Sequence, residues 1–388
     1  MLSVYIHIPF CIRKCLYCDF LSFPAEESTI EAYVEPLLEE IETESPKYAA
    51  YRVDTVFFGG GTPSVLKAGH IEHILSKLRN CYKFTEDPEI TIEVNPGTAD
   101  RQKFEKYKNA GVNRISIGTQ SVHDKELKVL GRIHNASEFF ETYRMVREAG
   151  FDNVNVDLMS ALPGQKAEEY GATLRTVMDL KPEHISAYSL IIEEGTPFFD
   201  MYGTDCSGTE QSLCLPTEEE ERLMYEETGK VLSKEGYYRY EISNYSLKGK
   251  ECRHNIAYWK RYNYVGFGLG AASMVENVRW RNTAELQEYL NAFRELKPNG
   301  KALKNIKEEI QHLNLNEQME EFMFLGLRLT EGVSRAEFLK MFCIDMEEVY
   351  GTVLKELSEK GLIECSERIK LTQYGRDVSN YVMSHFLF

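Results

Sequence analysis

The alternation of strand-like and helix-like segments constrains the fold of this chain more than any other feature of its sequence. Six short runs rich in β-branched or alternating apolar residues occur at residues 4–8, 55–58, 90–94, 114–117, 154–158 and 185–191. Between them, apolar residues recur at three- and four-residue spacing over residues 29–44, 68–81, 100–110, 137–149 and 168–180, as in amphipathic helices. Repeated strand-helix units predict an α/β fold with a parallel sheet. The pattern alone does not choose between an open, doubly wound sheet and a full or partial barrel.

The alternation of predicted strands and helices ends at about residue 217. A charged helix to residue 234, an aromatic strand over residues 237–242 and a segment rich in Gly and Tyr over residues 263–273 follow, and we expect this part to close one side of the sheet. From residue 317 the sequence predicts three helices, the second over residues 335–342 and the third over 346–360, then a strand pair around 363–371 and a last helix. This order is typical of a winged-helix-like α+β domain. The sequence therefore predicts three segments, 1–216, 217–316 and 317–388.

The charge balance excludes broad binding to nucleic acid. Among 388 residues, 45 Lys and Arg stand against 61 Asp and Glu, a formal net charge of −16. Residues 317–388 alone contain 8 basic and 13 acidic residues, so this winged-helix-like domain is not expected to bind DNA. No apolar run reaches the roughly 20 residues of a spanning helix, and residues 1–20 contain cysteines and charges where a signal peptide would be apolar. We therefore expect an intracellular, cytoplasmic protein.

Three cysteines lie within eight residues of one another, in the order Cys11, Cys15, Cys18. The total of nine cysteines is odd, which together with the missing export signal predicts reduced thiols rather than a disulfide framework. A zinc site usually has four ligands, often as two C-x2-C pairs, and here only one such pair exists. Three thiolates suit a [4Fe-4S] cluster with one iron left open for a small molecule. Zinc, and three unrelated cysteines, remain the alternatives.

Polar and glycine residues follow several of the predicted strands. Phe58-Gly59-Gly60-Gly61-Thr62-Pro63 ends the second strand, where glycines let backbone amides approach a charged ligand. Glu93, Gln120, Arg132 and Asp157 stand at or near the ends of later strands. Parallel folds bind ligands at the carboxyl ends of their strands, so a zwitterion with a ribose and an adenine could be held at this edge. Each residue taken singly also has an ordinary role in a turn or as a helix cap.

The C-x3-C-x2-C spacing, with Tyr17 before the last cysteine, resembles the radical S-adenosylmethionine (SAM) family. Further motifs, YIHIPFC, CDF, GGGTP, EVNPG, RISIGTQS, GRIH, DLMSALPGQ and EEGTP, are similar over the whole chain to the branch that contains the oxygen-independent coproporphyrinogen III oxidases and the haem chaperones of the HemW family. The resemblance implies a partial (β/α)6 TIM-like barrel and a [4Fe-4S] cluster on the three cysteines. It also implies a SAM site made by Tyr5, Tyr17, Gly60, Gly61, Thr62, Glu93, Gln120, Arg132 and Asp157.

Two features separate the relatives within this branch. The oxidases have a further cysteine two residues after the triad, whereas here Asp19 and Phe20 follow Cys18. His254 begins the segment HNIAYW, which resembles the HNxxYW motif associated with haem binding in the chaperones. A neutral imidazole is a natural ligand for haem iron, with Tyr258 and Trp259 available to cover the porphyrin. A histidine beside aromatic residues can equally be a packed structural residue. Cys252 is a candidate second ligand and Arg253 a candidate partner of a propionate.

The resemblance therefore predicts a haem chaperone that binds haem, SAM and a [4Fe-4S] cluster and delivers haem to apo-haemoproteins. The alternative is an oxygen-independent coproporphyrinogen III dehydrogenase working by oxidative decarboxylation, which the missing cysteine disfavours. A third reading is an iron-sulfur or zinc protein with neither activity. The family's acceptors tend to be respiratory and membrane-bound, and a homodimer or peripheral membrane contact is compatible with the resemblance. The sequence leaves open whether SAM is cleaved or only bound.

Overall fold

The computed structural model describes residues 1–203, 214–294 and 306–388 and has a 12-stranded sheet at its centre. Six parallel strands lie side by side in chain order: β1 (Leu2–Ile8), β4 (Arg52–Gly60), β5 (Lys83–Val94), β6 (Arg114–Gln120), β7 (Val154–Ser160) and β8 (His184–Ser189). In a doubly wound sheet the order of the strands across the sheet does not follow the chain throughout, because later strands are added on the other side of the first one. The six units therefore form the predicted partial barrel, and the apolar residues of its strands are almost all buried.

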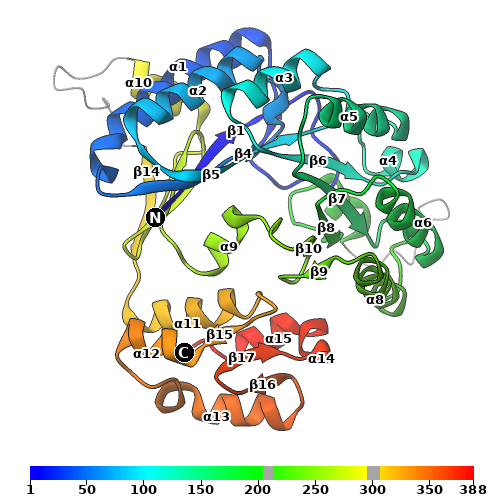
Figure 1. Cartoon of the computed structure of the whole chain (residues 1–388), viewed down its shortest axis with the longest axis vertical. Coiled ribbons are helices and arrows are strands. Elements are labelled where there is room, and N and C mark those ends of the chain that lie inside the picture. Colours follow the sequence, from blue (N-terminus) through cyan, green and yellow to red (C-terminus); the bar gives the residue numbers. More distant parts are fainter. Residues whose placement is uncertain (204–213, 295–305) are drawn as a thin grey trace.

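The helices between these strands lie along the outer side of the curved sheet (Figure 1). They are α1 (Glu27–Glu44), α2 (Ala68–Cys81), α3 (Arg101–Ala110), α5 (Ala136–Glu148) and α6 (Ala167–Met178), with the short α4 (Asp124–Val129) before α5. All five longer helices begin and end within two residues of the positions that the sequence predicts. Helix α3 shows why: the Asp100 side chain accepts the backbone N–H of Lys103 at its start, and Gly111 ends it with a φ of 98°.

Residues after 217 extend the sheet at both edges, whereas the sequence predicted closure of one side. At the β8 edge, β10 (Asn244–Ser246) and β9 (Tyr238–Arg239) add as antiparallel strands. Of the aromatic strand expected over residues 237–242, only Tyr238–Arg239 is a strand, and β10 follows that range. At the β1 edge, β11 (Tyr264–Phe267) pairs in parallel, and β12 (Ala272–Val275), β13 (Val278–Asn282) and β14 (Lys307–His312) continue antiparallel. A partial barrel has two open edges, and the unpaired backbone groups of each need partners.

Four further helices and two short strands complete this part of the chain. They are β2 (Phe10–Cys11), β3 (Phe23–Pro24), α7 (Pro197–Tyr202), α8 (Glu218–Lys234), α9 (Arg253–Trp259) and α10 (Leu286–Arg294). Helix α8 packs against α6, and α10 packs against α1. Helix α9 differs from the others because it lies on the inner side of the sheet, between the barrel and the C-terminal elements (Figure 1).

The C-terminal part has its own apolar core, built from buried residues between Met319 and Phe386. Its elements are α11 (Leu315–Gly326), β15 (Val333–Ser334), α12 (Arg335–Phe342), α13 (Met346–Glu359), β16 (Ile363–Cys365), β17 (Arg368–Leu371), α14 (Gln373–Asp377) and α15 (Ser379–Ser384). The three strands form an antiparallel sheet in the order β15-β17-β16, and β15 is a strand that the sequence did not reveal. The boundaries after residues 216 and 316 stay a prediction. Across the described ranges, we find no helix whose length and apolar character would let it span a bilayer.

Candidate functional site

A cavity of about 330 Å³ opens where the barrel strands end. Eleven of the thirteen residues singled out from the sequence line it: Cys11, Cys15, Tyr17, Cys18, Gly60, Gly61, Thr62, Glu93, Gln120, Arg132 and Asp157. They come from β2 and the loop after it, from the carboxyl ends of β4, β5 and β6, from the middle of β7, and from the turn after α4. We refer to this space as the mouth cavity. Tyr5 and His254 are the two candidates that lie outside it.

Hydrogen-bond donors from two other segments reach the sulfur atoms of the cysteine loop. The Thr62 hydroxyl donates to Sγ of Cys11 at 3.5 Å, and Nη1 of Arg132 donates to Sγ of Cys15 at 3.6 Å. Both contacts direct a hydrogen-bond donor at a cysteine sulfur that faces the cavity. Burial raises the pKa of the Cys18 thiol, so a bound metal would have to displace its proton. All three cysteines are free thiols.

The donor set fits an iron-sulfur cube better than a single zinc ion. Within the part of the chain that the structure describes, no three His, Cys, Asp or Glu side chains converge on one point where a lone ion could sit. A zinc ion would need four such ligands around one centre. In a [4Fe-4S] cube each cysteine binds a different iron, so the sulfur atoms stand apart. Cys11, Cys15 and Cys18 all line the mouth cavity, so three cysteine ligands for such a cube face one space. Cys206 lies outside the described residues.

Asn95 is a mouth residue that the sequence reasoning did not select. Its amide donates to the Thr62 hydroxyl at 2.8 Å, and its Oδ1 accepts from Nη2 of Arg132 at 2.7 Å. Arg132 also donates to the carbonyl of Gly118. Since Thr62 and Arg132 are the two residues that contact cysteine sulfurs, Asn95 joins both contacts into one network. Its position in the EVNPG motif, directly after β5, was the available signal.

Two carboxylates lie on the inner wall of the mouth. Burial, and to a smaller extent the nearby negative charge of Asp157, raises the pKa of Glu93 to about 8. Its Oε2 accepts the backbone N–H of Gly60 at 3.3 Å. Gly60 has a φ of 111°, and a Cβ there would lie 2.4 Å from the ring of His7, so only glycine fits. Asp157 accepts from Ser116 at 3.1 Å and from Asn155 at 2.7 Å. A cationic group such as an ammonium would be bound favourably between these carboxylates.

The mouth leads to a second, inner cavity of about 200 Å³. Glu93, Asp157 and Tyr188 line both spaces, and Tyr5 and His254 line only the inner one. Gln120 stands at the end of β6 with a φ of 67°, an uncommon conformation for a residue other than glycine, and such backbone strain occurs often at ligand sites. The structure thus divides the residues singled out from the sequence into a mouth group and an inner group.

His254 is held on both sides of its ring. Its Nδ1 lies 2.7 Å from the hydroxyl of Thr55, and its Nε2 lies 3.2 Å from the hydroxyl of Tyr258. The ring stacks on Phe57 with centroids 5.1 Å apart, and only 1% of the residue is exposed. Burial, assisted by the positive charge of Arg114, lowers the pKa of His254 to about 3, so the imidazole is neutral. Neutrality suits an iron ligand, but iron could reach Nε2 only by displacing the Tyr258 hydroxyl.

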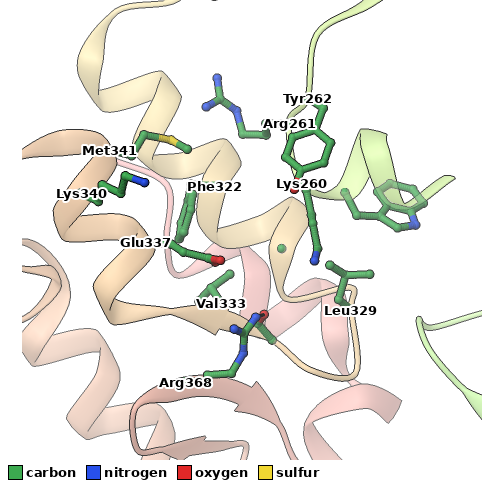
Figure 2. A pocket seen from close by; sticks show the side chains of 13 residues that line it. Lys260, Arg261, Tyr262, Phe322, Leu329, Val333, Glu337, Lys340, Met341 and Arg368 are labelled. Carbon is green, nitrogen blue, oxygen red and sulfur yellow. Dashed lines mark hydrogen bonds between the residues drawn. The ribbon is translucent and has the colours of Figure 1, made fainter. Parts of the chain in front are cut away.

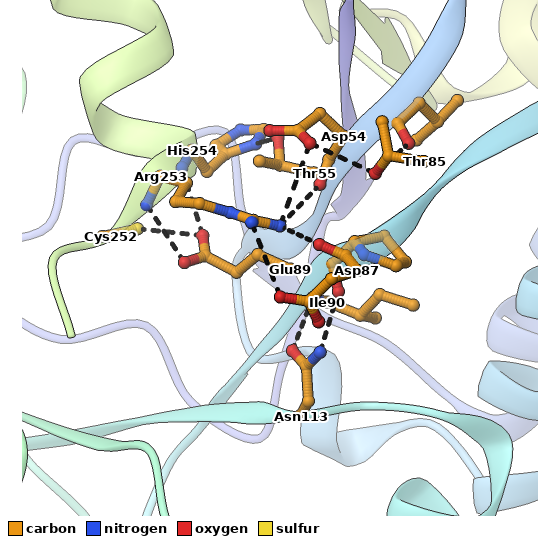
Figure 3. Close-up of polar contacts among 12 residues, drawn as sticks. Asp54, Thr55, Thr85, Asp87, Glu89, Ile90, Asn113, Cys252, Arg253 and His254 are labelled. Atoms are coloured by element: carbon orange, nitrogen blue, oxygen red, sulfur yellow. Dashed lines mark hydrogen bonds and ion pairs between the residues drawn. The ribbon is translucent and has the colours of Figure 1, made fainter. Parts of the chain in front are cut away.

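Glu89 anchors the start of the α9 helix (Figure 3). Its carboxylate accepts the backbone N–H groups of Arg253 at 3.0 Å and His254 at 3.1 Å, and the thiol of Cys252 at 3.6 Å. The Arg253 guanidinium donates to the carbonyl of Asp54 at 3.2 Å and also to that of Asp87. Burial raises the pKa of Cys252 to about 12. Cys252 and Arg253, the candidate partners of a haem, are therefore both bound by residues within β4 and β5.

Comparison with known proteins places the chain in a family. The Radical SAM superfamily matches residues 5–177, and the HemN C-terminal domain matches residues 313–378. The heme chaperone HemW of Bacillus subtilis is 35% identical over 100% of this chain and 99% of its own length. HemW of Lactococcus lactis is 36% identical over 99% and 97%, and HemW of Escherichia coli is 34% identical over 100% and 98%.

A solved structure shares the fold. The coproporphyrinogen III oxidase HemN of Escherichia coli, a radical SAM enzyme, aligns with a TM-score of 0.82 at 22% identity, over 99% of this chain and 89% of that one. Radical SAM membership implies SAM and a [4Fe-4S] cluster as the cofactors of such a chain. With full-length identity above 30% to several curated relatives, the chain belongs to the HemW family within the radical SAM superfamily.

Proposed function

We propose that this protein is a haem chaperone, which binds haem and passes it to apo-haemoproteins. The observation that carries the proposal is the full-length similarity to the heme chaperones HemW of three bacteria, at 34% to 36% identity. Two sequence features agree with it: Asp19 and Phe20 stand where the oxidases have a further cysteine, and HNIAYW is present at residues 254–259.

We propose that the mouth cavity holds the cluster and SAM. Cys11, Cys15 and Cys18 would ligate a [4Fe-4S] cluster, whose open iron can bind the amino and carboxylate groups of SAM. The nine SAM candidates have the chemistry for such a ligand, because Glu93 and Asp157 can accept an ammonium and Arg132 can pair with a carboxylate. Glycine is required at residues 60 and 61, because a Cβ would lie 2.4 Å from the His7 ring at Gly60 and 2.7 Å from the Phe10 carbonyl at Gly61. Tyr5 lines the inner cavity, so it would contact bound SAM from that cavity and not from the mouth cavity.

We also propose His254 as a residue of the haem-binding machinery. Its support is the HNxxYW resemblance together with a neutral imidazole in an aromatic setting. Ligation would require Nε2 to exchange the Tyr258 hydroxyl for iron, with Nδ1 still held by Thr55. That retained contact would orient the ring, as outer partners do for other metal-bound histidines.

The test is an anaerobic haem titration of cluster-loaded protein followed by absorption spectroscopy. We expect saturable one-to-one binding, with weaker affinity or altered ligation in His254→Ala. Tyr258→Phe keeps the aromatic contact and frees Nε2, so ligation should persist or strengthen. His73→Ala, at an exposed histidine of α2, serves as the matched control and should bind like the unmodified chain. Absence of haem binding by cluster-loaded protein would overturn the proposal.

The competing activity is decarboxylation of coproporphyrinogen III. The structural likeness to HemN rests on 22% identity and concerns the fold alone. Under anaerobic, reducing conditions with a filled cluster and SAM, we expect no vinyl product. Formation of that product would favour the dehydrogenase. Triple substitution of Cys11, Cys15 and Cys18 by Ser should abolish iron and sulfide incorporation, whereas one zinc bound per chain without brown absorbance would contradict the cluster.

We also propose which proteins receive the haem and where in the cell this protein acts. Acceptor haemoproteins of respiratory chains, a homodimer, peripheral contact with a membrane and a cytoplasmic location follow from the family resemblance and the sequence. The net charge of −16 disfavours direct contact with anionic lipid, so membrane contact would more naturally pass through an acceptor protein.

A further inference from the structure

A buried arginine lines the inner cavity. Arg114 begins strand β6, whose other end carries Gln120 at the mouth cavity, and only 2% of Arg114 is exposed. Burial, and to a smaller extent the charge of Arg114, lowers the pKa of His254, so the guanidinium lies near that imidazole. Because arginine stays protonated in proteins, the inner cavity contains a permanent positive charge beside the candidate iron ligand.

The guanidinium of Arg114 lacks a hydrogen-bond acceptor. Its Nε is buried without a partner, and none of the hydrogen bonds and ion pairs of residues 1–203, 214–294 and 306–388 involves its side chain. Glu89 and Asp157 contribute negative charge nearby, but both carboxylates accept hydrogen bonds from other groups. A buried charge without hydrogen bonds is costly. The donors of Arg114 are therefore available to an acceptor from outside the chain.

A carboxylate is the acceptor that suits Arg114 best. A guanidinium forms two parallel N–H···O bonds with a carboxylate, and such charge-assisted bonds are strongest where water is excluded. Two carboxyl groups of the chain, Glu93 and Asp157, also line the inner cavity and could repel an anion. Burial raises the pKa of both, that of Glu93 to about 8, so near neutral pH Glu93 is largely protonated and the repulsion is reduced.

Haem carries both of the groups that this cavity can bind. Its iron suits the neutral imidazole of His254, and its propionates suit Arg114. Tyr5, Phe57 and Tyr258 line the same cavity and offer aromatic surface to a flat ring. At about 200 Å³ the cavity is smaller than pockets that enclose a ligand of drug size, so it takes one side of the ring and leaves the rest outside.

We infer that Arg114 binds a propionate of the haem whose iron is ligated by His254. The inference rests on the proposed chaperone function and adds a second point of attachment to it. Two contacts on one flat ring fix its rotation about the bond between iron and nitrogen, which a histidine alone leaves free. The carboxylate of SAM has the same chemistry as a propionate, so the test measures both ligands.

The test titrates the full-length, cluster-loaded chain anaerobically with haem and with haem dimethyl ester in the same co-solvent. The ester keeps the ring and the iron but has no carboxylate. We expect the unmodified chain to bind haem at least about tenfold more tightly than the ester. Arg114→Met should bind haem about as weakly as the ester and should bind the ester like the unmodified chain. Its Soret spectrum with haem should still show ligation by His254.

Two further variants serve as controls. Arg147→Met removes a half-buried arginine of α5 that donates to Glu183 at 2.8 Å and lines neither cavity, so it should keep the full preference for haem. Arg114→Lys keeps the positive charge and should keep part of the preference. Because misfolding weakens the binding of both ligands alike, the ratio of the two affinities within one variant reports the propionate contact.

The outcomes separate this inference from the proposed function. If the unmodified chain binds neither ligand, the chaperone proposal fails and the inference fails with it. If it binds haem and the ester equally well, the function stands and the propionate contact is refuted. A preference for haem that survives in Arg114→Met refutes Arg114 as its cause. If that variant also binds SAM more weakly, the carboxylate held by Arg114 is that of SAM.

Discussion

The hydroxyl of Thr55 and Nδ1 of His254 lie 2.7 Å apart, although 199 residues separate them in the chain. This contact ties strand β4 of the barrel to helix α9 on the inner side of the sheet. Both groups are buried, so neither can exchange the other for water. The bond leaves Nε2, on the other side of the ring, as the nitrogen that a metal could reach.

Thr55→Val should lower the free energy of unfolding by about 1–2 kcal/mol, because it leaves Nδ1 of His254 buried without its partner. Valine keeps the shape of threonine, so packing is preserved. Urea unfolding followed by circular dichroism measures the change. If haem is ligated by His254, the Soret spectrum of the variant should also shift. Thr85→Val, at a half-buried threonine of β5, is the control, and equal losses in both variants would contradict a special role for the Thr55 contact.

Asn95→Ala should weaken SAM binding about tenfold, since Asn95 joins Thr62 and Arg132, the two residues whose side chains contact cysteine sulfurs. Equilibrium binding of SAM to cluster-loaded protein is the measurement. Asn314→Ala removes the N-cap of α11, far from the mouth in sequence, and should cost about 1 kcal/mol of stability while leaving SAM binding unchanged. SAM affinity that is insensitive to Asn95→Ala would count against the network.

Glu89→Gln should destabilise the chain by about 2 kcal/mol. The carboxylate accepts two backbone N–H groups and a thiol at the start of α9, and an amide would turn an N–H donor toward one of them. Glu86→Gln, three residues earlier on β5 and exposed, changes the same group without these contacts. Thermal unfolding of both variants gives the comparison, and similar melting temperatures would contradict the anchoring role.

Stability should fall as the pH rises through the range set by Glu40. Burial raises the pKa of this carboxyl from 4.5 to about 7, although Tyr289, the Gly268 N–H and Asn282 all donate to it. Between these pH values the folded chain holds a proton that the unfolded chain releases, so unfolding becomes easier, by at most about 3 kcal/mol. Glu40→Gln cannot titrate and should show a flatter dependence in urea unfolding between about pH 5 and about pH 8. Parallel curves for both proteins would rule Glu40 out as the cause.

Local residue patterns were sufficient to predict the central units of the fold. The helix signals at residues 68–81 match α2, because its apolar spacing and bounding residues act within the segment itself. The strand ends carrying Glu93, Gln120 and Asp157 were predicted to share one edge, and the structure brings them to one cavity. Partners of these residues were harder to find. Thr55 and Glu89 carry no distinctive signal, and Asn95 has only its place in the EVNPG motif, since the roles of all three depend on contacts with residues far away in the chain.

The sequence by itself determined the six strand-helix units, their parallel pairing and the cysteine loop at the strand ends, because periodicity, caps and short motifs act over a few residues. Only the tertiary structure decided how residues 217–316 are used, since the two open edges of a partial barrel become visible only once the sheet is curved. It also decided that His254 lines the inner cavity, hydrogen-bonded on both ring nitrogens, while Trp259 on the same helix lines a separate cleft with Tyr262 and Met341 (Figure 2). Those placements follow from packing between segments that the sequence keeps far apart.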